Sequence, residues 1–181
     1  MFRLARFREA SARGNVTAMP ILDPFASDPL VDGRQSVRAL EIRRGVERLL
    51  IELGAACLPE LSLASGRRAD MTALFPGGDI WIVEIKSSIE DLRADRKWPD
   101  YRTHCDRLFF ATHEGVPADL FPANCGFLLA DAFGAAMLRD APEHRLAAAT
   151  RKAVTLRFAR AAALRLSTAE RAGYTVINPI E

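Results

Sequence analysis

"DIWIVEIKSS", residues 79–88, decides which fold this chain can adopt. Five of the seven residues from Ile80 to Lys86 are large and apolar, which predicts a β-strand buried on at least one face. Side chains alternate along a strand, so Glu84 and Lys86 share a face at the far end of this one. An acid and a base inside so apolar a strand need partners or a function.

A second acid stands in the preceding strand. Residues 69–75, "ADMTALF", read as a strand, and "PGGD" at 76–79 is a strong turn signal, so the two strands are expected to form an antiparallel hairpin. Asp70 then lies near Glu84. Two carboxylates side by side repel each other unless a cation lies between them, and their hard oxygens suit Mg²⁺ or Mn²⁺. Lys86 beside them would orient a water or offset phosphate charge.

The hairpin register tests this hypothesis. A two-residue turn at 77–78 would place Asp70 opposite Ile85, facing away from Glu84. A shared site therefore requires an odd-numbered connection or a bulge, and we predict that irregularity. A regular even-numbered hairpin would exclude the metal site.

The remaining pattern predicts a mixed α/β domain with a central mixed sheet flanked by helices. A helix of about 18 residues is expected between a capping box at Asp32 and Gln35 and a stop at Leu53–Gly54. A second helical segment, capped by Ser88 with Asp91, would be interrupted at Pro99. Further strands are expected at 56–63 (with Pro59 at an edge), 107–113 and 126–132, a returning hairpin strand at 133–140, and a long helix from about 140 to 166.

Composition limits the function classes. The 181 residues suit one domain at 31–181, after an extended or disordered Arg-rich segment at 1–30. No apolar run approaches the roughly 18 residues of a membrane span, so no membrane partner is expected. The three cysteines form no C-x-x-C pair and the three histidines show no ligand spacing, which disfavours disulfides and zinc and favours a cytoplasmic location.

Charge is local rather than global. The net charge is only +2, but Arg34–Arg48 and Glu143–Arg171 are rich in arginine, so they are either solvated helix faces or surfaces that follow a phosphate backbone. Only three of the 25 basic residues are lysines, and this rarity suggests that Lys86 is used for its compact ammonium.

Several stretches resemble a known family. The segments "PLVDGRQS", "RRGVERLL", "RRADMTAL", "VEIKSSIEDLRADRKWPDYRTHCDRLFFA" and "LRFARAAALRL" look like the MmcB family of bacterial DNA-repair-associated proteins, over about residues 28 to 166. The Asp and Glu-x-Lys pattern resembles the PD-(D/E)XK nuclease superfamily, which implies a restriction-endonuclease-like core.

The resemblance implies a role for each matching residue. Asp70 and Glu84 would be metal ligands, with the Ile85 carbonyl as a third, and Lys86 would be the catalytic lysine. Ala69 stands where the motif nominally has Pro. Glu47 matches an additional acid or is a solvated flank residue. DNA contacts, each with a surface or packing alternative, would come from Arg43, Arg44, Arg67, Arg68, Lys97 and Tyr101, the last two on one helical face.

The sequence thus predicts a Mg²⁺- or Mn²⁺-dependent nuclease that acts on DNA in repair, with other repair proteins as candidate partners. The alternative is a catalytically silent module of the same fold that binds DNA or a partner. A small-molecule α/β protein is a third class, which no Gly-rich phosphate loop supports. A solvent-reachable cleft beside Asp70 and Glu84 would favour the enzyme, and a sealed Glu84–Lys86 pair would favour a structural role.

Overall fold

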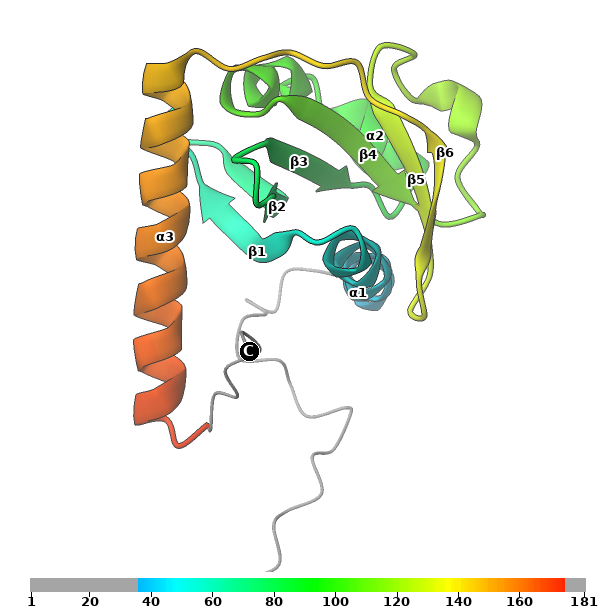
Figure 1. Ribbon diagram of the computed structural model, residues 1–181. Coiled ribbons are helices and arrows are strands. Elements are labelled where there is room, and N and C mark those ends of the chain that lie inside the picture. The colour runs from blue at the N-terminus through cyan, green and yellow to red at the C-terminus, as the bar shows by residue number, and fades with distance from the viewer. Residues whose placement is uncertain (1–35, 175–181) are drawn as a thin grey trace, which may run out of the picture. The chain divides into compact units, whose positions relative to one another are not determined.

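The computed structural model describes residues 36–174, which form a mixed α/β unit (Figure 1). Predictions for residues 1–30, and for the capping box at Asp32 and Gln35, lie outside the described residues. The helices are α1 (Val37–Glu52), α2 (Ile89–Ala94) and α3 (Ala148–Arg171), with the 3₁₀ turns η1 (Trp98–His104) and η2 (Ala118–Leu120). The strands are β1 (Ala56–Ser62), β2 (Arg68–Leu74), β3 (Ile80–Ile85), β4 (Arg107–Thr112), β5 (Gly126–Ala130) and β6 (Ala135–Arg139).

These strands form a six-stranded sheet whose spatial order follows the chain, β1 to β6. The pairs β1–β2, β2–β3 and β5–β6 are antiparallel, and β3–β4 and β4–β5 are parallel. The predicted mixed sheet flanked by helices is confirmed, and it is consistent with a restriction-endonuclease-like core. Pro59 lies in β1, at the edge of this sheet, where its missing N–H breaks no ladder on the open side.

Two apolar layers bury the two faces of the sheet. On one face, Ile42, Val46 and Leu50 of α1 pack with Val83 and Ile85. On the other face, η1 and α3 cover the sheet through Tyr101, Val154 and Phe158, which pack with Ile80 and Ile82. Figure 1 shows α1 below the sheet and α3 standing beside β1. Glu84 alternates with Ile80 and Ile82, so it points toward the layer of η1 and α3.

The β2–β3 hairpin has the irregular connection that the site requires. Leu74 pairs with Ile80 and Met71 with Val83, so residues opposite each other follow an odd-loop register. The N–H of Phe75 donates to Asp79 O at 3.0 Å, leaving three residues, 76–78, in the loop. Gly78 has φ +86°, the left-handed conformation that closes three-residue hairpin loops. The predicted odd connection is confirmed.

Helix α1 begins and ends on local signals. The Ser36 hydroxyl accepts a hydrogen bond from the N–H of Ala39 at 3.1 Å, which caps the first turn. At the other end Gly54 adopts φ +88°, so the predicted stop at Leu53–Gly54 is confirmed.

Two helical predictions were wrong in their bounds. The Ser88 cap is confirmed, since its hydroxyl accepts from the N–H of Asp91 at 3.1 Å, but α2 ends at Ala94 and the chain restarts as the 3₁₀ turn η1. The last helix begins at Ala148, not near 140. The preceding segment is held extended because the N–H groups of His144 and Leu146 donate to the backbone and the carboxylate of Asp106.

Candidate functional site

The hairpin register brings Asp70 opposite Glu84. One step beyond the pair Met71 and Val83, the ladder gives way to bonds between side chains and backbone. The Glu84 carboxylate accepts from the N–H of Asp70 at 3.3 Å, and the Asp70 carboxylate accepts from the N–H of Ile85 at 2.8 Å. Each acid is therefore fixed by the backbone of the opposite strand, and the two lie together where the strands separate.

Burial makes this acid pair electrostatically unfavourable. Glu84 is 2% exposed, and its pKa is raised well above the usual value, first by burial and then by the charge of Asp70. Burial raises the pKa of Asp70 to about 6, although the Ile85 hydrogen bond and the charge of Lys86 act in the opposite direction. Near neutral pH the pair favours a proton or a cation between its carboxylates.

Lys86 is the basic residue of this site. Its position is fixed by Asp95, which the sequence analysis did not single out. Its Nζ lies 3.9 Å from Glu84 Oε2 and 2.7 Å from Asp95 Oδ2. Burial opposes the charge on Lys86, but its hydrogen bond with Asp95 and the charge of Glu84 raise its pKa overall. Asp95 is the residue directly after α2, so only the early end of that helix places it here.

Tyr101 closes the site from the side of η1. It is buried, and its hydroxyl donates to Arg68 O at 3.3 Å. Burial, and then the neighbouring charges of Glu84 and Asp70, raise its pKa. For Tyr101, packing inside the protein is therefore favoured over a direct contact with DNA. Lys97 is exposed at the start of η1, so the expectation that Lys97 and Tyr101 share one α-helical face was wrong.

The predicted basic residues lie in three different settings. Arg67 binds Asp100, with 2.8 Å between its Nη2 and the carboxylate, and Arg68 pairs with Glu60. Arg43 and Arg44 belong to α1, which packs on the opposite face of the sheet from Tyr101; Arg43 is buried and Arg44 exposed. The structure does not bring these two to the acid pair.

Glu47 also lies away from Asp70 and Glu84. Its charge acts on Cys57 of β1, where burial first and then Glu47 raise the pKa of the thiol to about 12. The strongest charges on the acid pair come instead from Lys86 and from carboxylates outside α1. The structure thus does not place Glu47 among the candidate metal ligands.

The donors present suit a hard divalent cation. Within residues 36–174 no cluster of three or more His, Cys, Asp or Glu side chains is arranged to hold a metal. Mg²⁺ does not need such a cluster, because it is commonly held by one or two carboxylates together with waters and substrate phosphates. The desolvated pair of Asp70 and Glu84, with its raised pKa values, has the chemistry that such a cation would relieve.

Comparison with known proteins identifies the family of this chain. Residues 26–173 match the family described as DNA repair protein MmcB-like. The chain belongs to this family. It is also similar to a solved structure, the SPO1766 protein of unknown function from Silicibacter pomeroyi, with 41% sequence identity and a TM-score of 0.72 over 80% of this chain and 99% of the other. No curated protein gives a significant match.

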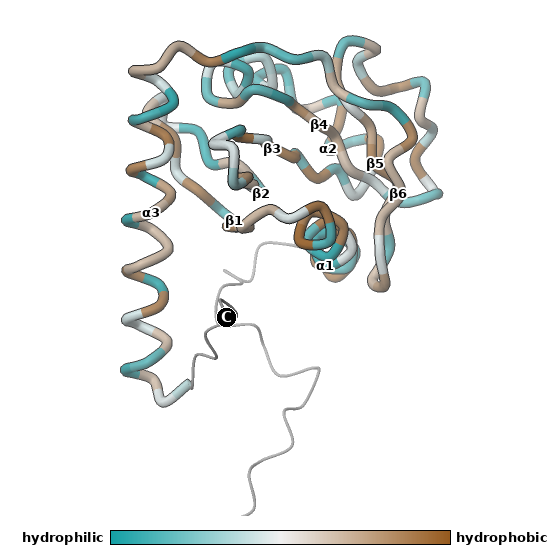
Figure 2. The backbone as a smooth tube through the Cα atoms, viewed as in Figure 1, coloured by the Kyte–Doolittle hydropathy of each residue, from teal (hydrophilic) through white to brown (hydrophobic). Residues whose placement is uncertain are grey.

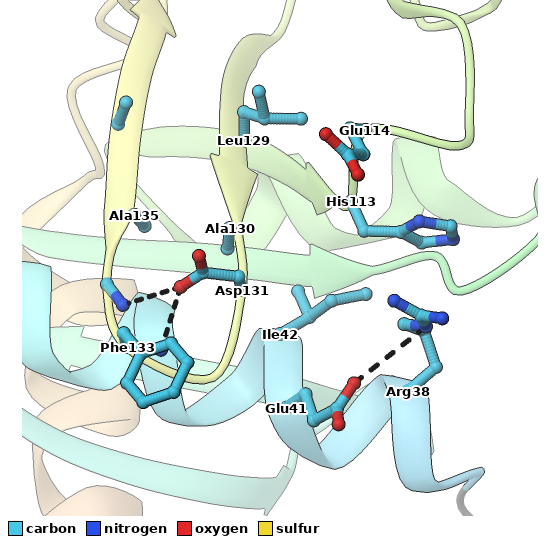
Figure 3. A pocket seen from close by; sticks show the side chains of 12 residues that line it. Arg38, Glu41, Ile42, His113, Glu114, Leu129, Ala130, Asp131, Phe133 and Ala135 are labelled. Atoms are coloured by element: carbon cyan, nitrogen blue, oxygen red, sulfur yellow. Dashed lines mark hydrogen bonds and ion pairs between the residues drawn. The ribbon is translucent and has the colours of Figure 1, made fainter.

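The MmcB-like chain also has a cavity of about 550 Å³ between α1 and the β5–β6 hairpin (Figure 3). Figure 3 shows Arg38 and His113 on one side of it and Phe133 on the other. Its carboxylates, Glu41, Glu114 and Asp131, outnumber its one guanidinium, and Arg38 lies 3.8 Å from Glu41. Such a lining disfavours a polyanion, so this cavity is not a candidate nucleic-acid site.

No helix in the described part of the MmcB-like chain is both long enough and apolar enough to cross a membrane. The family match indicates a role in DNA repair, and the solved relative, itself of unknown function, adds no activity to it.

Proposed function

We propose that this MmcB-like protein is a PD-(D/E)XK nuclease that hydrolyses DNA phosphodiester bonds with Mg²⁺ or Mn²⁺, in a cytoplasmic repair context. The observation that carries the proposal is the three-residue hairpin loop, which sets Asp70 opposite Glu84. Two strands this apolar have no structural need for facing carboxylates. The repulsion between Asp70 and Glu84 costs free energy that a bound cation would remove.

Asp70 and Glu84 would hold the cation, with the Ile85 carbonyl as a third contact. When bound, Mg²⁺ supplies Lewis-acid polarisation of a phosphoryl oxygen and activation of a water. The protein's own part is to fix these donors in a buried place, through the backbone hydrogen bonds at Asp70 and Ile85. Donors that are already positioned need no reorganisation when the reaction occurs.

Lys86 would orient the attacking water or offset charge that develops on the phosphate. Its ammonium is held between Glu84 and Asp95, so its position does not depend on substrate. Tyr101 excludes solvent from Glu84 and fixes the backbone at Arg68 through its hydroxyl. This support from a second layer of residues is what keeps a catalytic group within reach of its target.

Phosphate contacts would come from the side of the sheet that holds the acid pair. Helix α3 lies on that side, and the charge of Arg157 reaches His104 in η1, where it helps burial to lower the pKa of the imidazole. Exposed bases of α3 include Arg157 and Arg171. For Arg67 and Arg68 to bind phosphate, they must exchange their partners Asp100 and Glu60.

A second candidate function is a catalytically silent module that binds DNA or a repair protein. It is favoured by the burial of Glu84 and Lys86, 2% and 6% exposed, and by the short bond from Lys86 to Asp95. A closed network of this kind is also what a buried structural ion pair looks like. Activity measurements separate the two candidates.

The test is cleavage of single-stranded, duplex and branched DNA by purified protein in Mg²⁺, in Mn²⁺ and in EDTA. We expect metal-dependent cleavage that Asp70→Asn and Glu84→Gln abolish and that Lys86→Ala lowers by about 10²–10³-fold. Asp119→Asn is the matched control, because Asp119 is an exposed carboxylate of η2 that has no predicted role in metal or DNA binding. DNA binding without cleavage of any substrate would replace the nuclease with the silent module.

Metal binding gives a second readout that does not need activity. Titration of Mn²⁺, followed by electron paramagnetic resonance, should show one site that is lost in Asp70→Asn and in Glu84→Gln. Asp119→Asn, at an exposed carboxylate of η2, should leave the site unchanged. Equal Mn²⁺ binding by all variants would place the cation elsewhere.

A further inference from the structure

Helix α3 carries an apolar stripe on the side that faces away from the sheet. The side of α3 that faces the sheet is anchored by the buried residues Val154 and Phe158. On the outward side, Leu156 and Leu166 are 54% and 42% exposed. Between the two leucines, exposed alanines at Ala159 and Ala163 continue the same line, with the alternating spacing of three and four residues that coiled-coil seams use. Figure 2 shows hydrophobic residues recurring along this helix, which stands at the margin of the sheet.

The stripe is symmetric about position 161. Leu156 and Leu166 are equally far from that position, as are Ala159 and Ala163. The same symmetry relates two opposite charges farther out, Lys152 toward the N-terminus of the helix and Glu170 toward its C-terminus; both are exposed. A surface with this arrangement is complementary to a copy of itself that runs in the opposite direction.

We propose that this face of α3 docks a second copy of the chain, with the two helices antiparallel about a two-fold axis near position 161. Leu156 then packs on the partner's Leu166, and Ala159 on the partner's Ala163. Lys152 meets the partner's Glu170 at each end. In such an isologous contact every interaction occurs twice. The inference is independent of the proposed function, because none of these residues lies in the acid site.

The residue types suit a close helix pair. Small side chains at the centre allow helix axes to approach to about 8 Å, the short end of the usual range. The segment from Lys152 to Glu170 is about 27 Å long, at 1.5 Å per residue. Stable complexes bury roughly 1,200–2,000 Å² of surface, and an interface of one helix per copy falls at or below the low end of that range. A weak and reversible dimer is therefore expected.

The positive charge of Arg160 opposes the pairing, and its removal therefore tests the proposed dimer. Arg160 lies on the flank of the stripe close to the axis, where the two copies of Arg160 approach each other. Like charges at a helix interface are destabilising. The proposal therefore expects Arg160→Ala to strengthen the dimer, which an unrelated surface would not show.

Leu164 supplies a matched control. It is 62% exposed, more than either leucine of the stripe, and it lies on the same helix. It is off the stripe, however, on the side of Arg157 and Arg160. A dimer that depended only on exposed apolar area would lose as much from Leu164→Glu as from Leu156→Glu.

The experiment is sedimentation equilibrium of the full chain from low micromolar to near-millimolar concentration, with circular dichroism to check that each variant is folded. We expect a monomer–dimer equilibrium whose Kd rises at least tenfold in Leu156→Glu and is nearly unchanged in Leu164→Glu, the tenfold change corresponding to about 1.4 kcal/mol. Lys152→Glu and Glu170→Lys should each weaken the dimer, and the double variant should restore it. A wild-type chain that stays monomeric, equal losses from the two leucine variants, or a double variant that fails to recover would overturn the proposal.

Discussion

At the scale of single residues, Asp70 and Glu84 suit the proposed function but lower the stability of the metal-free protein. The folded protein holds both carboxylates in a buried site where their pKa values are raised. A carboxyl group with a raised pKa binds more protons folded than unfolded, so its contribution to the free energy of unfolding falls as pH rises through that pKa. The site is thus expected to destabilise the metal-free protein at neutral and higher pH.

Asp70→Asn is predicted to stabilise the metal-free protein at pH 8 by roughly 1–3 kcal/mol, because it removes one of two buried like charges. The gain should shrink below about pH 6, where Asp70 itself takes up a proton. Urea unfolding in EDTA at several pH values measures the effect. Added Mg²⁺ should stabilise the wild type and not the variant; a variant less stable than the wild type at pH 8 would contradict the like-charge account.

The sequence predicted the three central residues of the candidate site but not their support. Asp70, Glu84 and Lys86 follow from strand alternation and the register condition, which depend on local sequence. Asp95 and the inward position of Tyr101 depend on where α2 ends and η1 begins. The sequence predicted an interruption only at Pro99, whereas α2 already ends at Ala94, before η1 begins at Trp98.

At the scale of elements, the β2–β3 loop determines whether the site can exist. A loop shorter by one residue would turn Asp70 away from Glu84, because strand faces alternate at every residue. The glycine at its end holds the left-handed conformation that makes the three-residue loop possible.

Gly78→Ala is therefore predicted to cost about 1 kcal/mol of stability, since a side chain at φ +86° is strained even though open space surrounds it. Gly77→Ala is the control, because Gly77 has open space and no positive φ. Thermal unfolding of both variants measures the difference. Equal effects would show that the backbone at Gly78 is not what fixes the loop.

A second determinant of the elements is Asp106, which fixes the start of α3. Its carboxylate accepts from the N–H of Ile80 at 2.8 Å and of Leu146 at 3.0 Å, and binds Arg151 at 2.7 Å. Although its burial acts in the opposite direction, these partners lower the pKa of Asp106. No local pattern predicts this cluster, because its members are far apart in the chain: Ile80 in β3, Asp106 just before β4, and Leu146 and Arg151 before and within α3.

Asp106→Asn is predicted to lower stability by about 2–3 kcal/mol at pH 7, somewhat less than a fully buried pair because Arg151 is partly exposed. Because the folded pKa is lowered, the stabilisation is complete above the ordinary carboxyl pKa and is lost as pH falls through the folded value. The wild type should therefore approach the variant in acid. Asp140→Asn, which removes the exposed partner of Arg107, should change stability by less than about 1 kcal/mol.

At the scale of the whole molecule, the sequence predicted a mixed sheet flanked by helices but not which helix covers which face of it. A strand was predicted near each of the six observed strands, and the hairpins β2–β3 and β5–β6 were predicted as well, the first from a turn signal. The parallel neighbours β3, β4 and β5 were not predicted, because parallel pairing depends on crossovers rather than on local pattern. The layers matter for function, since they put α1, with Arg43 and Arg44, on the opposite face of the sheet from α3 and η1, toward which Glu84 points.

This separation predicts which face binds DNA. Arg157→Ala, on the side of the acid pair, should weaken binding to duplex DNA and lower the slope of log K against log salt by about 1, the loss of one phosphate contact. Arg44→Ala removes another exposed charge, from α1 on the opposite face, and should leave both affinity and slope unchanged. Fluorescence anisotropy across a salt series measures both. If Arg44→Ala has the larger effect, DNA lies against α1, where it cannot reach Asp70 and Glu84, and a nuclease that uses these acids is excluded.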